Sequence, residues 1–230
     1  MYHNLQVMQF NAHEISELQL KDKTDAGNSA FIGGGIYPTV AFFNHSCDPG
    51  VVRYFNGNVI QLRAIKPIAE GQVIAENYGP IFTQMPKEER QQQLLRQYHF
   101  NCMCTPCMEN WPTFKEMDDS HLRFRCDGLN RSCKNVLKVP LDVNDFMMKC
   151  SECGEHTNIM KGLKSLQDTD MLFKTATRLH ETGDSKSALT KYVETLDILD
   201  QSLVPPFRTY HLTQQGIKRC ITEFGNKVYL

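Results

Sequence analysis

The order of hydrophobic and polar positions divides the chain into three regions of different character. The first, residues 1–83, carries short apolar runs broken by Gly, Pro and Asn-Gly signals, which is the pattern of a β-rich region. Two of these runs, 58–65 and 72–76, predict strands. The Asn-Gly pair just before the first run predicts a tight hairpin turn, because Asn and Gly tolerate a positive φ. We expect Gly33–Gly35 to lie in a loop.

A run of strong helix formers, PKEERQQQLLRQY, predicts a helix over residues 86–98. Its proline suits the first turn, and the acidic residues that follow favour the positive end of the helix dipole. Leu94, Leu95 and Tyr98 form the expected buried stripe. Cysteine-bearing segments then occupy the chain from residue 102 to residue 153.

Beyond Gly162 the pattern becomes helical. Apolar residues recur at three- and four-residue spacing between Ala188 and Leu199, which gives that helix one apolar face. A Gly-Asp pair breaks the preceding helix, a Pro-Pro pair ends this one, and a third helix is expected at about 209–224. Two helices joined by a short turn suit an antiparallel pair of the tetratricopeptide kind. Because one such unit cannot bury its own face, we expect it to dock on the preceding domain.

Composition and charge narrow the classes of function. The chain has 230 residues, and its 25 Lys and Arg against 26 Asp and Glu give a formal net charge of -1, which argues against a dedicated nucleic-acid binder. No apolar run is long enough to span a membrane, and the first residues do not form a secretory signal. A reducing compartment is therefore expected, where clustered cysteines are more often metal ligands than disulfides.

Three of the nine cysteines, Cys102, Cys104 and Cys107, form a C-x-C-x2-C cluster. Three thiolates this close can converge on one ion, and tetrahedral Zn²⁺ is the natural occupant. A closed site needs a fourth ligand from a distant Cys or His, and Cys47 is free to supply it. The alternative is a chance cluster of unligated thiols.

A second set of four cysteines follows. Its members are Cys126, Cys133, Cys150 and Cys153. The last pair has the C-x2-C spacing of a zinc knuckle, and strand-like runs at 122–125, 136–141 and 145–149 lie between the pairs as in a zinc ribbon. Because the first pair is unusually wide, His156 is a candidate substitute ligand. The ninth cysteine, Cys220, is expected to be a small buried hydrophobic residue.

Two polar segments carry further candidate chemistry. Asn-His-Ser-Cys at 44–47 follows an apolar run and implies side chains that make defined hydrogen bonds. Glu-Asn-Tyr-Gly at 76–79 ends a strand-like run, where Tyr78 could present its hydroxyl into a narrow cleft. Taken alone, each has a plain structural interpretation, an ordinary turn for the first and a packed aromatic residue for the second.

Together, NHSC, ENYG and FNCMCTPC, in this order and spacing, resemble the SET-domain lysine methyltransferases, in particular the SET and MYND domain-containing (SMYD) family and its tetratricopeptide-bearing, fourth-member-like branch. Further agreements are FNAHEIS, GGGIYPTVAFFNHSCDP, EERQQQLLRQYHFNCMCTPC and IKRCITEFGN. The resemblance covers nearly the whole chain, with residues 126–153 as an inserted zinc module. It implies an α+β fold, with the β-rich C-terminal half of a SET domain, a zinc-bound post-SET segment, an inserted zinc ribbon and an all-α, tetratricopeptide-like tail.

The implied domain organisation has four parts. They are the C-terminal part of the SET domain (1–83), the post-SET helix and zinc segment (84–110), a zinc-ribbon-like insert (111–163) and a helical, tetratricopeptide-like region (164–230). Family members carry a Gly-x-Gly cofactor segment and a MYND zinc finger N-terminal to this region. Neither is found in this sequence, so the resemblance leads us to expect a truncated chain.

The resemblance implies an S-adenosylmethionine-dependent protein-lysine N-methyltransferase. Tyr78 resembles the catalytic tyrosine of a lysine channel. Asn44 and His45 resemble the pair that holds the cofactor's amino and adenine groups, Asn11 resembles an Asn at its methionine end or ribose, and Phe100 resembles the aromatic residue that packs on the adenine. The alternative is a non-catalytic zinc-binding interaction module or a truncated paralogue.

The resemblance also implies ligands, partners and location. Cys47 joins the C-x-C-x2-C cluster as the fourth ligand of a structural post-SET zinc, and the ribbon cysteines hold a second zinc. The expected substrate is a lysine of a histone or another protein, and the helical tail is expected to bind protein partners. We expect no membrane contact, no nucleic-acid partner, and a location in the cytoplasm, the nucleus or both.

Overall fold

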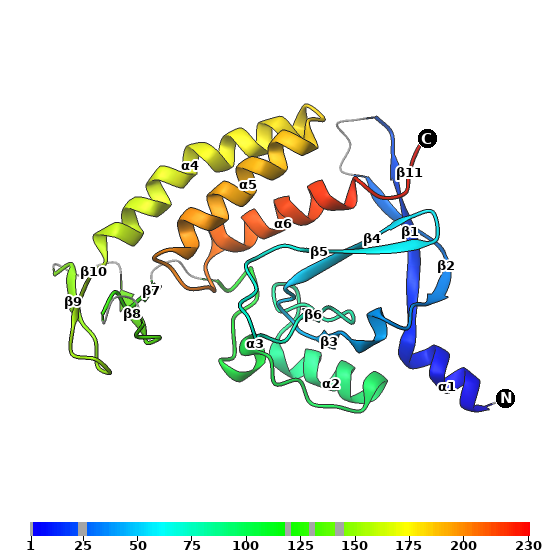
Figure 1. Ribbon diagram of the computed structural model, residues 1–230, viewed down its shortest axis with the longest axis horizontal. Helices are drawn as coiled ribbons and strands as arrows, with labels where there is room; N and C mark the ends of the chain where they lie inside the picture. The colour runs from blue at the N-terminus through cyan, green and yellow to red at the C-terminus, as the bar shows by residue number, and fades with distance from the viewer. Residues whose placement is uncertain (1, 23–26, 118–120, 129–131, 141–144) are drawn as a thin grey trace. The chain divides into compact units, whose positions relative to one another are not determined.

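The computed structural model describes most of the chain and divides it into two compact units. The described residues are 2–22, 27–117, 121–128, 132–140 and 145–230. Unit 1 comprises residues 1–115, 181–185 and 218–230, and unit 2 comprises residues 116–180 and 186–217. Strands and helices occur in both, so the expected mixed α+β class is confirmed (Figure 1). Among the described residues, no helix is both long and apolar enough to cross a membrane.

The largest sheet of unit 1 has three strands in the order β11-β1-β2. β1 (Ala12–Leu20) pairs antiparallel with β2 (Asn28–Ile36) and parallel with β11 (Lys227–Tyr229), although β11 lies near the other end of the chain (Figure 1). The loop expected at Gly33–Gly35 is wrong, because these glycines lie within β2, opposite β1. Pairing with β1 satisfies the backbone groups that face it, and this outweighs the weak strand preference of glycine.

Two smaller strand pairs also lie among the described residues of unit 1. β4 (Val51–Asn56) and β5 (Val59–Ala64) form the hairpin that the Asn-Gly signal predicted, with Gly57 at a φ of 62°. β3 (Asn44–His45) and β6 (Ala75–Glu76) form a short parallel pair. The strand expected over 72–76 is therefore confined to its last two residues. Residues 71–74 are exposed, and Gln72 hydrogen-bonds with Ala69 in a turn.

Unit 1 also contains helices, and two of them were not expected. α1 (Tyr2–Asn11) lies in the region predicted to be β-rich and has no buried residue. A 3-10 turn at Val40–Phe42 precedes β3. α2 (Lys87–Tyr98) and the short α3 (Thr105–Met108) follow β6. In α2 the expected buried stripe is wrong at Leu95, which is 49% exposed, whereas Leu94 is fully buried. Consecutive residues on a helix are about 100° apart, so only one of the two leucines faces the core.

Unit 2 contains strands at the three predicted runs, a fourth strand that was not predicted, and most of three long helices; residue 141, at the end of the second run, lies outside the described residues. β7 (His121–Arg125) pairs with β8 (Val136–Pro140), and β9 (Met147–Lys149) pairs with β10 (His156–Asn158), both antiparallel. The helices are α4 (Met160–Glu181), α5 (Ser185–Asp200) and α6 (Arg208–Thr222). The apolar face predicted for α5 is buried at Ala188, Tyr192, Leu196 and Leu199. The predicted burial of Cys220 is confirmed as well, at the end of α6.

Candidate active site and metal centres

A cluster of four rings gathers around the end of β6 in unit 1. Tyr78 is central, with its ring centroid 5.2 Å from that of His45, 5.0 Å from that of Tyr98 and 6.5 Å from that of Phe100. The short pairing of β3 with β6 places the NHSC and ENYG segments side by side. The last residue of α2, Tyr98, and Phe100 just after the helix supply the other two rings. Tyr98 was predicted only as part of the packed stripe of its helix, and the structure adds it to this cluster.

The hydroxyl group of Tyr78 is held in one position. It donates a hydrogen bond to the main-chain carbonyl of Phe43 at 2.5 Å, and the hydroxyl of Tyr98 donates to the carbonyl of Tyr78 itself at 3.3 Å. Burial, followed by the nearby Glu76 and Tyr98, raises the pKa of Tyr78 above its ordinary value. The hydroxyl therefore stays protonated at neutral pH and acts as a fixed hydrogen-bond donor.

His45 joins this ring cluster to a cysteine. Its Nδ1 accepts a hydrogen bond from the backbone N–H of Tyr78 at 3.0 Å, and its Nε2 lies 3.4 Å from Sγ of Cys47. Burial is the main cause that lowers the pKa of His45, to about 4. The ring is therefore neutral, with Nδ1 as acceptor and Nε2–H directed at the sulfur. This tautomer fixes the ring plane beside Tyr78.

The first cysteine set converges in space. Sγ atoms of Cys47, Cys102, Cys104 and Cys107 all lie within 4.8 Å of one another. Zn–S bonds of about 2.3 Å in a tetrahedron require sulfur–sulfur edges of about 3.8 Å, and the Cys47–Cys107 edge measures 3.6 Å. That separation is too long for a disulfide. The four sulfurs therefore fit a zinc ion, which would tie the NHSC turn to the segment after α2.

The surroundings of this tetrad favour a thiolate at Cys104. Hydrogen bonds from the thiols of Cys102 and Cys47 and from backbone N–H groups lower the pKa of Cys104, whereas side-chain hydrogen bonds within the tetrad raise the pKa of Cys47 and of Cys102. Arg90 of α2 is fully buried, and its Nη2 lies 3.6 Å from Sγ of Cys107 while its Nη1 donates to the carbonyl of Met85. A guanidinium beside clustered thiolates offsets part of their negative charge. Within a run of helix formers, nothing in the sequence distinguishes this arginine from a solvated one.

The second cysteine set also converges, in unit 2. Sγ atoms of its four members lie within 4.8 Å of one another, with edges of 3.6 Å for Cys126–Cys153 and 3.9 Å for Cys133–Cys150. Hydrogen bonds from the backbone N–H of Cys153 and from the Asn135 side chain lower the pKa of Cys150 to about 6. His156 lies outside this group, so four cysteines complete the donor set without it.

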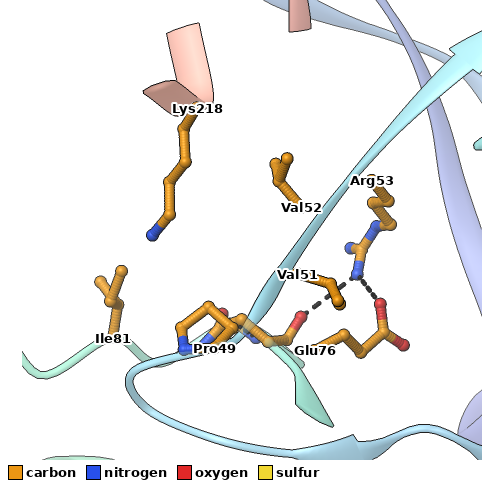
Figure 2. A pocket seen from close by; sticks show the side chains of 9 residues that line it. Pro49, Val51, Val52, Arg53, Glu76, Ile81 and Lys218 are labelled. Atoms are coloured by element: carbon orange, nitrogen blue, oxygen red, sulfur yellow. Dashed lines mark hydrogen bonds and ion pairs between the residues drawn. The ribbon is translucent and has the colours of Figure 1, made fainter. Parts of the chain in front are cut away.

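A buried carboxylate supports the strand pair that carries the ring cluster. Glu76 accepts hydrogen bonds from Nε2 of His13 at 3.0 Å and from Nη1 of Arg53 at 2.7 Å, and the same Nη1 donates to the carbonyl of Asn77 (Figure 2). Burial alone would raise the pKa of Glu76, but these bonds and the positive charges of their donors outweigh it and lower the pKa. The carboxylate of Glu76 on β6 is thus hydrogen-bonded to one side chain of β1 and one of β4.

The remaining candidate cofactor residues lie at the margin of this region. Asn44 is exposed on β3, next to His45. Asn11 ends α1, and its side-chain amide donates to the carbonyl of Val7 in the same helix at 2.9 Å. Phe10, its neighbour, does reach them, with its ring centroid 6.5 Å from that of Tyr98. The cofactor contacts of both asparagines stay predictions.

Comparison with known proteins identifies a domain in the N-terminal part of the chain. Residues 6–79 match the family described as "SET domain". This range contains β1 to β6 and ends one residue after Tyr78. Both polar segments of the candidate site therefore lie within the matched domain.

Three relatives extend the similarity. The chain is 28% identical over 193 residues to "Protein-lysine N-methyltransferase SMYD4" of Mus musculus and 30% identical over 160 residues to its Homo sapiens counterpart, covering 84% and 68% of this chain. It is 27% identical over 154 residues to "Histone-lysine N-methyltransferase SMYD3" of Homo sapiens, covering 57% of this chain. These matches span 23%, 19% and 35% of the respective relatives, so the chain corresponds to a minor part of each.

Proposed function

We propose that this chain catalyses methyl transfer from S-adenosylmethionine to a lysine of a protein substrate. The premise is that it carries a SET domain and is related to the SMYD protein-lysine methyltransferases. The observation that carries the proposal is the ring cluster around Tyr78, whose hydroxyl is fixed on the carbonyl of Phe43. Aromatic walls and one fixed polar pair suit a narrow channel for an alkyl amine.

The groups of the chain have defined tasks in this reaction. When bound, S-adenosylmethionine supplies an electrophilic methyl group on its sulfonium. The rings of Tyr78, Tyr98 and Phe100 exclude water, and desolvation lowers the pKa of a lysine and favours its neutral amine. The Tyr78 hydroxyl and the Phe43 carbonyl offer hydrogen-bond partners that orient the amine. Positioning and electrostatics thus supply most of the catalysis.

The cofactor is proposed to bind beside His45. Asn44 and His45 would hold its amino and adenine groups, Phe100 would pack on the adenine, and Asn11 would contact its methionine end or ribose. The exposed side chain of Asn44 and the ring contact of 6.1 Å between His45 and Phe100 support this placement. Asn11 would have to release its bond to Val7 in order to take part.

Each cysteine tetrad is proposed to hold one structural zinc ion. The sulfur–sulfur edges of 3.6 Å and 3.9 Å and the burial of Cys47, Cys126 and Cys150 support this assignment. Metal analysis of the purified chain tests it, with two zinc ions per chain expected. Fewer than two in a folded protein would overturn at least one site.

The experiment that tests the enzymatic proposal starts with cofactor binding. S-adenosylmethionine is titrated calorimetrically into the zinc-loaded chain, and methyl transfer to a lysine-containing protein is then followed with labelled cofactor. We expect Tyr78→Phe to retain cofactor binding and the fold but to lose methyl transfer by about tenfold, the size of one lost hydrogen bond of about 1.4 kcal/mol that orients the amine. Tyr229→Phe, at an exposed tyrosine, is the matched control and should be unchanged.

Two outcomes contradict the proposal in different ways. A folded, zinc-loaded chain that binds no S-adenosylmethionine would favour the non-catalytic interaction module. Cofactor binding with an unchanged rate in Tyr78→Phe would remove this hydroxyl from the mechanism.

The helical region is proposed to bind protein partners through a tetratricopeptide-like pair. The buried inner face of α5 supports a packed helical scaffold of this kind.

The protein is proposed to work in the cytoplasm, the nucleus or both. Fractionation of cells that express the chain tests the location, and recovery with membranes alone would contradict it.

A further inference from the structure

A pocket of about 350 Å³ opens in unit 1 on the β4 side of the ENYG segment. Apolar side chains form much of its wall, namely those of Pro49, Val51, Val52 and Ile81. Polar groups enter from three elements, since Lys218 comes from α6 and the Arg53–Glu76 pair comes from β4 and β6 (Figure 2). A small apolar cavity with a few converging polar groups is the usual form of a ligand site.

Lys218 is the unusual member of this lining. Figure 2 shows its side chain extended toward Ile81 and Pro49, on the side of the pocket opposite Arg53. No hydrogen bond or ion pair joins its ammonium group to any of the residues that the structure describes. Burial is the main cause that lowers the pKa of Lys218, and the proximity of Lys66 adds to it.

The acidic groups nearby are already committed to other cations. Asp48, whose charge acts on Lys218, accepts a hydrogen bond from Nζ of Lys66 at 2.6 Å. Glu76 is bonded to Arg53 and His13. The ammonium group of the half-buried Lys218 is therefore only partly compensated, and an anion placed in the pocket would improve this.

We propose that this pocket binds a carboxylate carried on a short apolar chain, with the Lys218 ammonium as its counter-charge and the Pro49, Val51, Val52 and Ile81 side chains as the wall for its apolar part. A volume of about 350 Å³ lies near the lower end of the range for small-molecule sites, which suits a group of this size. The carboxylate belongs either to a free small acid or to a glutamate side chain of a bound peptide. The proposal does not depend on methyl transfer.

The test uses two probes and measures binding to the zinc-loaded 230-residue chain by calorimetry and thermal unfolding. One probe is 3-methylbutyrate, a free acid, and the other is N-acetylglutamate N-methylamide, a blocked glutamate. Their neutral counterparts, 3-methylbutyramide and N-acetylglutamine N-methylamide, are the controls. We expect at least one acid to bind and to raise the melting temperature with concentration, while neither neutral compound does. Tighter binding of the blocked glutamate assigns the site to a peptide, and the reverse assigns it to a free acid.

Substitutions at Lys218 make the test specific. Lys218→Met should fold at least as stably as the parent chain, because it removes an unpaired ammonium group, and should weaken binding of the acid at least tenfold. Lys218→Arg retains the charge and should retain most of the binding. Failure of both acids to bind, or equal binding to the Lys218→Met chain, would overturn the proposal.

Discussion

The carboxylate of Glu76 is predicted to contribute to stability through its charge, and Glu76→Gln tests this. Glutamine keeps the shape of the side chain and one oxygen acceptor, so packing is preserved. Two hydrogen bonds change, those from Nε2 of His13 at 3.0 Å and from Nη1 of Arg53 at 2.7 Å. Glu76 itself is 3% exposed, and therefore water replaces little of what is lost.

The expected loss in free energy of unfolding follows from these two hydrogen bonds. A hydrogen bond to a charged group contributes about 1.5–3 kcal/mol, against about 0.5–1.5 kcal/mol for a neutral one. Arg53 is partly exposed and keeps its bond to the carbonyl of Asn77, so its share is reduced by solvent. We therefore expect Glu76→Gln to lower the free energy of unfolding by about 2 kcal/mol at pH 7.

The difference in free energy of unfolding between the parent chain and Glu76→Gln should become smaller as the pH falls. Because the folded protein holds the pKa of Glu76 below its ordinary value, the stabilisation is complete above the unfolded pKa and is lost as pH falls through the lower, folded one. Glutamine does not titrate. The difference should therefore stay near its full size from pH 7 down to about 5 and shrink below about 4.

Urea unfolding of the zinc-loaded proteins at steps of pH measures this difference. Glu14→Gln, at an exposed position of β1, is the matched control and should change stability by less than about 0.5 kcal/mol. The reasoning would be refuted if Glu76→Gln were as mild as the control at pH 7, or if its effect grew as the pH was lowered.

Three further substitutions test packing and metal binding. Leu94→Ala should lower the free energy of unfolding by about 2–5 kcal/mol. Leu95→Ala, at an exposed site on the same helix, should change it by less than about 0.5 kcal/mol. Equal losses in urea titrations would contradict the burial pattern. Cys126→Ser should remove one zinc ion per chain in metal analysis, and Cys220→Ser, outside both tetrads, should remove none. Gly216→Ala should cost about 1–3 kcal/mol in thermal unfolding, because its Cβ would lie 2.5 Å from a tyrosine ring of α5, and unchanged stability would show that this packing yields easily.

Local patterns in the sequence were sufficient for the elements whose cause is local. The Asn-Gly signal predicted the β4–β5 hairpin, because the turn needs a residue that accepts a positive φ. Three- and four-residue periodicity predicted α5, because a helix with one apolar face must bury it. The spacing of Cys150 and Cys153 similarly indicated a metal knuckle before any geometry was known.

Where local patterns were weak or misleading, tertiary contacts decided the structure. The sequence predicted a loop at the glycines of β2, but in the structure they pair with β1. α1 lies in the region that was predicted to be β-rich. The partners of Glu76 are also beyond the reach of a local pattern, since they lie on two other strands. A pairing of this kind depends on register, which short-range sequence preference does not encode.

By itself, the sequence determined the chemistry of this protein, with its two cysteine sets, its NHSC and ENYG segments and its α+β class. Only the tertiary structure brought Cys47 to the other three sulfurs of its tetrad, set Tyr98 against Tyr78, and placed the Lys218 ammonium beside a pocket with no hydrogen-bond or ion-pair partner among the described residues. The physical reason is range. Turn, helix and ligand-spacing signals act over a few residues, whereas these contacts join distant segments whose approach is set by burial and strand pairing across unit 1.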